Sequence, residues 1–154
     1  IQKMSGSIEG LVETSTNIGI VKLSEDEFFG SSGVRSSVEA ARDALSDKIQ
    51  YLTEFLGGSY EIQGAYPAWE YRKDSPLRDK MVAVYEKMYG NKPEVVAIHA
   101  GLECGLFYKK IDGLDCVSLG PDMKDIHTSE EVLDIASAGR VWEYLVKVLA
   151  DLKD

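Results

Sequence analysis

The stretch from Glu94 to Glu131 reads EVVAIHAGLECGLFYKKIDGLDCVSLGPDMKDIHTSEE, and it decides the expected fold of the second half of the chain. Its apolar runs predict two strands, Glu94–Ile98 and Asp115–Leu119, with a short helix over 102–109 between them. The chain's two histidines, His99 and His127, each follow one of these runs. Ligands and metals collect at strand ends in sheets flanked by helices, so we expect functional residues here.

Helical patterns flank this stretch on both sides. Ser75-Pro76 predicts a capped helix start, an apolar face follows over 77–88, and Gly90 predicts the helix end. A last helix is predicted after 127, with Ser137 as its cap and an apolar face over 141–152. Because helices and strands alternate in this half, the pattern predicts an α/β lobe with parallel strands.

The first half has a different pattern. Residues 1–9 are polar and predict a frayed entry, whereas Leu11–Leu23 and Phe28–Ser36 predict a β-hairpin. From Ser37, taken as an N-cap, apolar residues recur every three or four positions and predict a helix over 37–56, ended by Gly57-Gly58. Tyr60–Gly64 predicts a further short strand. This order predicts an antiparallel sheet with a helix on one face.

The two patterns meet at Ala65–Asp74, which contains a proline and shows no clear period. We read this segment as a linker and predict two lobes, 1–71 and 72–154. The predicted fold class is therefore α/β, with an α+β piece followed by an α/β piece.

Composition limits the classes of function. A length of 154 residues suits one domain or two small lobes, and the net charge of −9 argues against a nucleic-acid surface. No run suggests a membrane span or a signal peptide. Cys104 and Cys116 make no disulfide framework, so we expect reduced thiols and a cytosolic compartment. Because the first residue is Ile1 and not Met, we expect the chain to be either a fragment or a trimmed product of a longer protein.

Several residues are candidates for a site, each with a plain structural alternative. His127, in a polar loop, could ligate zinc, but zinc needs three or four ligands and a surface histidine is the alternative. His99 could position a substrate or be a strand-end histidine satisfied by the backbone. Arg35 is the only charged residue between Phe28 and Val38. Its guanidinium could hold a carboxylate, or it could be an edge-strand surface residue.

The small-residue segment 101–105 allows two further interpretations. Gly101 and Gly105 let the backbone approach a ligand closely. Cys104 with His99 could form a thiol nucleophile and base, although a small buried cysteine is the alternative.

Taken together, the segments HAGLECG (99–105), SLGP (118–121) and HTSEE (127–131) closely resemble the C-terminal end of the aminoacyl-histidine dipeptidases. These enzymes are also called Xaa-His or cytosolic non-specific dipeptidases and form part of the M20 metallopeptidase family. VETSTNIG (12–19) and GAYPAW (64–69) resemble the same family, so the resemblance runs from about Gly10 onward.

The resemblance implies the last part of a zinc peptidase, with 1–71 as the end of a lid domain and 72–154 as the end of a catalytic α/β domain. It implies two zinc ions in the complete enzyme, one of them bound by His127. Arg35 corresponds to the lid arginine that holds the substrate carboxylate, and Gly101 to a glycine whose backbone faces the substrate. The family has Ser-Pro after the histidine, where this chain has Thr128-Ser129.

The resemblance also implies an activity and partners. The complete enzyme would hydrolyse dipeptides, Xaa-His dipeptides included, with metal-activated water in the cytoplasm. The resemblance also allows a homodimer formed through the lid. The bridging aspartate, the general base and most metal ligands would lie in a missing N-terminal part. We therefore expect the 154-residue chain alone to be inactive and to hold zinc weakly, with His127 exposed. The alternatives are a non-catalytic binding or dimerisation module of this fold, and a thiol hydrolase using Cys104 and His99.

Overall fold

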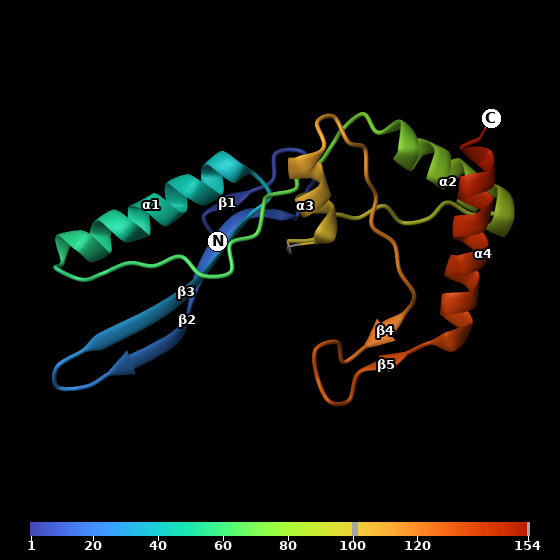
Figure 1. Ribbon diagram of the computed structural model, residues 1–154. Helices are drawn as coiled ribbons and strands as arrows, with labels where there is room; N and C mark the ends of the chain where they lie inside the picture. Colours follow the sequence, from blue (N-terminus) through green and yellow to red (C-terminus); the bar gives the residue numbers. More distant parts are fainter. Residues whose placement is uncertain (100–101, 154) are drawn as a thin grey trace. The chain divides into compact units, whose positions relative to one another are not determined.

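The computed structural model describes residues 1–99 and 102–153 and contains both helices and strands, as predicted (Figure 1). Its elements are, in order, β1 (Lys3–Met4), β2 (Val12–Leu23), β3 (Phe28–Ser36), α1 (Glu39–Phe55), α2 (Pro76–Tyr89), α3 (Glu103–Lys110), β4 (Met123–Lys124), β5 (Val132–Leu133) and α4 (Ile135–Asp151).

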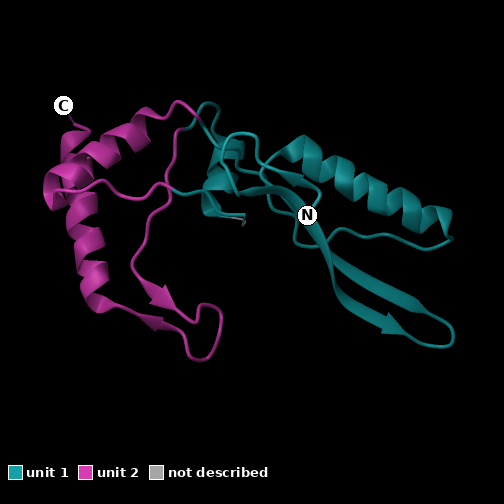
Figure 2. Cartoon of the chain, turned by 180° about the vertical axis from the view of Figure 1, so that it is seen from behind, with its two compact units in different colours: residues 1–72, 96–114 teal, residues 73–95, 115–154 magenta. Residues whose placement is uncertain are grey.

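The chain forms two compact units (Figure 2). Unit 1 comprises residues 1–72 and 96–114, and unit 2 comprises residues 73–95 and 115–154. The chain therefore passes from one unit to the other three times. The assignment of 1–71 to a lid and 72–154 to a catalytic domain concerns the complete protein and stays a prediction.

The sheet of unit 1 has the strand order β1-β2-β3, and both pairs are antiparallel. The predicted hairpin of β2 and β3 is confirmed; its runs of Thr, Val and Ile suit strands. A bulge between Ile18 and Ile20 shifts its register by one residue. The predicted frayed entry is wrong, because Lys3 and Met4 pair with β2 as β1.

Helix α1 confirms the predicted helix after the hairpin, but the predicted cap at Ser37 is wrong. The N-cap residue is Val38, which makes no side-chain cap, and its N–H donates to the hydroxyl of Ser36 instead (3.1 Å). At the other end Gly57 has a φ of 83°, a left-handed conformation that glycine adopts without steric cost.

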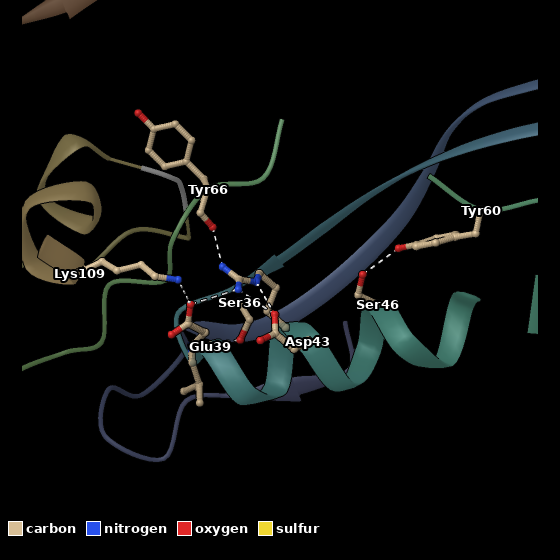
Figure 3. Close-up of polar contacts among 9 residues, drawn as sticks. Ser36, Glu39, Asp43, Ser46, Tyr60, Tyr66 and Lys109 are labelled. Atoms are coloured by element: carbon tan, nitrogen blue, oxygen red, sulfur yellow. Dashed lines mark hydrogen bonds and ion pairs between the residues drawn. The ribbon is translucent and has the colours of Figure 1, made fainter. Parts of the chain in front are cut away.

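Polar contacts attach α3 and the segment 65–69 to α1 (Figure 3). Lys109 of α3 forms an ion pair with Glu39 (2.7 Å), and Arg42 donates to the carbonyl of Tyr66 (2.6 Å). Gly105 of α3 lies so close to the 65–69 segment that a Cβ there would be 3.0 Å from the Pro67 carbonyl oxygen. Helix α3 is thus held against α1 and the segment 65–69 within unit 1.

Unit 2 is built on α2 and α4. Met81 and Val84 of α2 and Tyr144 and Val148 of α4 form its buried apolar cluster. The Tyr144 hydroxyl donates to the Met81 carbonyl (2.7 Å), which satisfies the one polar atom of this side chain. The apolar faces predicted for both helices are confirmed here.

The helix starts in unit 2 follow capping rules. Ser75 caps α2 as predicted: its hydroxyl accepts from the Arg78 N–H (3.1 Å), and Gly90 ends the helix with a φ of 76°. The predicted cap of α4 at Ser137 is wrong. Asp134 is the N-cap, and its carboxylate accepts from the Ser137 N–H (2.8 Å).

The predicted strands at Tyr60–Gly64, Glu94–Ile98 and Asp115–Leu119 are wrong, since the structure has no strand there. The second half instead contains the short antiparallel pair β4–β5. A strand requires a partner for its backbone groups. No strand in the described part of the chain pairs with these segments, so their strand-like sequences stay extended or irregular.

Candidate functional site

Arg35 lies near the end of β3, directly opposite Ser15 of β2. Residues opposite one another in an antiparallel pair project from the same face of the sheet. Ser15 and Arg35 therefore share a face, and the β2–β3 register is what brings them together.

His99 contacts both of these residues. Its Nε2 atom lies 2.8 Å from the hydroxyl of Ser15, and its backbone carbonyl accepts a hydrogen bond from Nη1 of Arg35 (3.4 Å). The hydroxyl of serine can donate or accept, so it suits either tautomer of the ring. The second contact is long for a hydrogen bond and thus weak.

The electrostatics of this group favour a neutral imidazole. Burial lowers the pKa of His99 below its usual value, and the nearby positive charge of Arg35 lowers it further. Arg35 itself is exposed, and no carboxylate lies within ion-pair distance of it among the described residues. The contact with His99 uses one of five guanidinium N–H donors. The arrangement can therefore receive a carboxylate from solution.

Gly101 lies outside the described residues, so the structure does not test its predicted role. The residues on either side of the gap belong to unit 1, because His99 is held by the sheet and α3 is held by α1. Cys104 is half-buried at the start of α3. Since Nε2 of His99 bonds Ser15, this geometry adds no support to a pairing of Cys104 with His99.

His127 lies in unit 2, in the loop between β4 and β5. Its side chain is exposed, as predicted, and its backbone has a φ of 67°. Its N–H donates to Oε2 of Glu131 (2.8 Å), so that carboxylate binds the backbone of His127. A left-handed conformation is uncommon for a residue with a Cβ, and such residues cluster at functional sites.

The described residues around His127 do not by themselves form a zinc site. No group of three His, Cys, Asp or Glu side chains able to hold a metal occurs within residues 1–99 and 102–153. A zinc site needs at least three protein ligands. The exposed imidazole therefore fits one zinc ligand, and the others would have to come from outside the described chain.

The sequence did not indicate Ser15 as a site residue. In the structure it lies opposite Arg35, which was predicted, and it bonds His99. Arg35 and His99 are brought together in unit 1, whereas His127 belongs to unit 2 and is described separately. Within the described residues, no helix has the length and apolar character needed to cross a membrane.

Two known proteins, both named as dipeptidases, are similar to this chain in sequence or structure. The crystal structure of aminoacylhistidine dipeptidase from Vibrio alginolyticus matches 97% of the chain with a TM-score of 0.83 and 35% sequence identity. The cytosol non-specific dipeptidase of Escherichia coli (strain K12) is 33% identical over 144 residues, 94% of the chain. No family model matches.

The predicted resemblance to the aminoacyl-histidine, or cytosolic non-specific, dipeptidases is thereby confirmed, and so is the mixed α/β fold. The chain spans 30% of the length of the E. coli relative and 31% of the Vibrio chain. It is therefore homologous to one portion of these dipeptidases.

Proposed function

We propose that this chain is the C-terminal portion of a dizinc dipeptidase of the M20 family, which hydrolyses dipeptides, Xaa-His dipeptides included, in the cytoplasm. The observation that carries the proposal is that two proteins named as dipeptidases match almost the whole chain at 33% and 35% identity. In this proposal residues 1–71 end a lid domain and residues 72–154 end the catalytic domain.

Arg35 binds the C-terminal carboxylate of the substrate. A guanidinium can hold a carboxylate through two parallel hydrogen bonds, which fixes both position and orientation. The exposure of Arg35 and the lack of a described carboxylate partner support this role. A carboxylate bound at a fixed distance from the reacting carbonyl restricts the enzyme to short peptides. Gly101 contributes a backbone group that faces the substrate.

His127 provides one ligand to the metal centre. When bound, zinc would polarise the peptide carbonyl and lower the pKa of a water molecule. The exposure and left-handed backbone of His127 support its role as a ligand. The remaining ligands and the general base belong to parts of the protein outside this chain.

The complete enzyme forms a homodimer through the lid. The strand order leaves β3 at the edge of its sheet, where a second strand can pair with it. The outer half of the hairpin also exposes apolar side chains: Ile18, Ile20, Val21, Leu23, Phe28 and Phe29. By the strand register they lie on both faces of the hairpin, and exposed apolar side chains in such number are typical of a surface that a partner covers.

Kinetics of Arg35→Lys and Arg35→Ala in the complete, metal-loaded enzyme test the proposal. Lysine keeps the charge but loses the fork, so KM for dipeptides should rise by roughly tenfold or more, with a larger rise for alanine. A dipeptide with its C-terminus amidated has no carboxylate for Arg35, so its kinetics should change little. An enzyme that hydrolyses no dipeptide, or an Arg35→Ala variant with unchanged dipeptide kinetics, would contradict the proposal.

A further inference from the structure

We propose that His99 is a positioning residue: it connects Ser15 to Arg35 and holds the guanidinium where it meets the substrate carboxylate. This inference rests on the proposed function, because it assigns a task to His99 in substrate binding by Arg35. Ser15 belongs to the same arrangement, because its hydroxyl forms a hydrogen bond with the imidazole of His99.

Ser15 and Arg35 project from the same face of the hairpin. Ser15 and Arg35 are direct cross-strand neighbours, and His99 comes from a segment 84 residues beyond Ser15 in the sequence. Within the described part of unit 1, its two hydrogen bonds join residues 96–99 to the hairpin. The position of these residues beside the hairpin therefore depends on His99.

His99 uses two different atoms in these contacts. The side chain bonds Ser15 (2.8 Å), and the backbone carbonyl accepts from Arg35 (3.4 Å). The short side-chain contact fixes the residue, and the weaker carbonyl contact then biases the guanidinium towards one position. An arginine has many rotamers, and restricting them before binding reduces the entropy lost when the substrate arrives.

His99 and Gly101 are also close together in the sequence. His99 is two residues before Gly101, so the same peptide segment carries the carbonyl that contacts Arg35 and leads to the glycine assigned to the substrate. The lowered pKa of His99 agrees with this arrangement, because a neutral ring adds no second positive charge beside Arg35.

A histidine that only stabilises the fold would make the same contacts. The test therefore measures the preference for a free C-terminal carboxylate, which a purely structural role would not affect. In the complete, metal-loaded enzyme, kcat and KM are measured for a dipeptide and for the same dipeptide with an amidated C-terminus. The variants are His99→Ala, His99→Gln, Ser15→Ala and Arg35→Ala. The control is Ser46→Ala, which removes a hydrogen bond of similar length to Tyr60 (2.7 Å), also in unit 1 (Figure 3).

We expect Ser15→Ala and His99→Ala to raise KM for the dipeptide by roughly two- to tenfold, the range of one lost hydrogen bond. Their kcat and their kinetics on the amide should be nearly unchanged. His99→Gln, which keeps a polar group, should recover part of the loss, and Ser46→Ala should leave both substrates unaffected. If His99→Ala fails to fold, Ser15→Ala, which deletes a single hydroxyl, carries the test.

Two results would overturn the inference while leaving the proposed function intact. One is that Arg35→Ala abolishes the preference for the carboxylate while the Ser15 and His99 variants keep it. The other is that these variants lose activity equally on both substrates, as a structural defect would cause. If Arg35→Ala itself keeps the preference, or no dipeptide is hydrolysed, the proposed function fails and this inference fails with it.

Discussion

Two effects act on the imidazole of His99, and both lower its pKa: burial first, and then the positive charge of Arg35. We expect its pKa to lie below 6.5 in the 154-residue chain. In Arg35→Gln the pKa should rise, but only part of the way to 6.5, because burial is the larger cause. Titration of the ring protons by NMR measures this directly, with His127→Gln used to assign the two histidines.

The sign of the effect on stability follows from the same shift. In the unfolded state His99 takes up a proton as the pH falls below about 6.5, while in the folded state it stays neutral longer. Its contribution to the free energy of unfolding is thus complete above about 6.5 and is lost as the pH falls through the folded pKa. A pKa of His99 above 6.5, or one unchanged by Arg35→Gln, would contradict this account of its surroundings.

The sequence marks Arg35, because it is the only charged residue in its strand. No comparable feature of the sequence marks Ser15. Counting back from the turn, where Leu23 faces Phe28, would place Thr16 opposite Arg35. The bulge between Ile18 and Ile20 shifts the pairing by one residue, so that Ser15 takes this place. A shift of one residue also exchanges the two faces of a strand. The partner of His99 is therefore set by a bulge that local pattern did not predict.

Helix ends show which parts of an element can be predicted. Ser75 was recognised as a cap because Pro76 follows it, and proline suits the first helical position. The predicted caps Ser37 and Ser137 are wrong, because serine is common both at the N-cap position and at the positions beside it. In α4 the earlier Asp134 accepts from the backbone, and Ser137 lies in the first turn. For the helices, the element type follows from periodicity, whereas the boundaries depend on competing caps.

Two helical glycines should respond oppositely to substitution by alanine. Gly139 in α4 has open space around its Cβ position. Gly139→Ala should raise the free energy of unfolding by roughly 0.5–1 kcal/mol, because alanine loses less entropy in a helix. Gly105 in α3 is buried, and a Cβ there would lie 3.0 Å from the Pro67 carbonyl oxygen. We expect Gly105→Ala to destabilise, since a main-chain atom cannot easily move aside.

Urea unfolding of the two variants beside the parent chain measures this difference. The two glycines serve as each other's control, since the substitution is the same and only the surroundings differ. Equal stabilisation by both substitutions would show that α3 can move away from the segment 65–69.

Across the whole chain, the largest difference between the predicted and the observed fold lies in segments whose residues favour a strand but do not form one. Val95, Val96 and Ile98 are 53%, 66% and 57% exposed, although their sequence favours a buried strand. Periodicity and residue type predict the capacity to form a strand, but pairing depends on a partner elsewhere in the chain. The described residues do not provide one.

The proposed function therefore predicts a difference in hydrogen exchange. In a complete protein of the relatives' length, the backbone amides of 95–98 should exchange slowly, because a neighbouring strand would bind them. In the 154-residue chain they should exchange quickly. Amides of α4 provide the internal reference in both proteins, since they are hydrogen bonded within the helix. Slow exchange of 95–98 in the short chain would show that it already contains the missing partner.

The last prediction concerns metal and activity in the chain by itself. We expect it to bind zinc only weakly and to hydrolyse no dipeptide, because the described residues present His127 without two further ligands around it. Two acids of the same region have other contacts: Glu131 accepts from the His127 N–H, and Asp122 pairs with Arg140 at 3.4 Å. Calorimetric titration of zinc into the parent chain, His127→Ala and the control His99→Gln measures this. Sub-micromolar binding that His127→Ala alone abolishes, or hydrolysis of a dipeptide by the chain, would mean that it already contains a complete site.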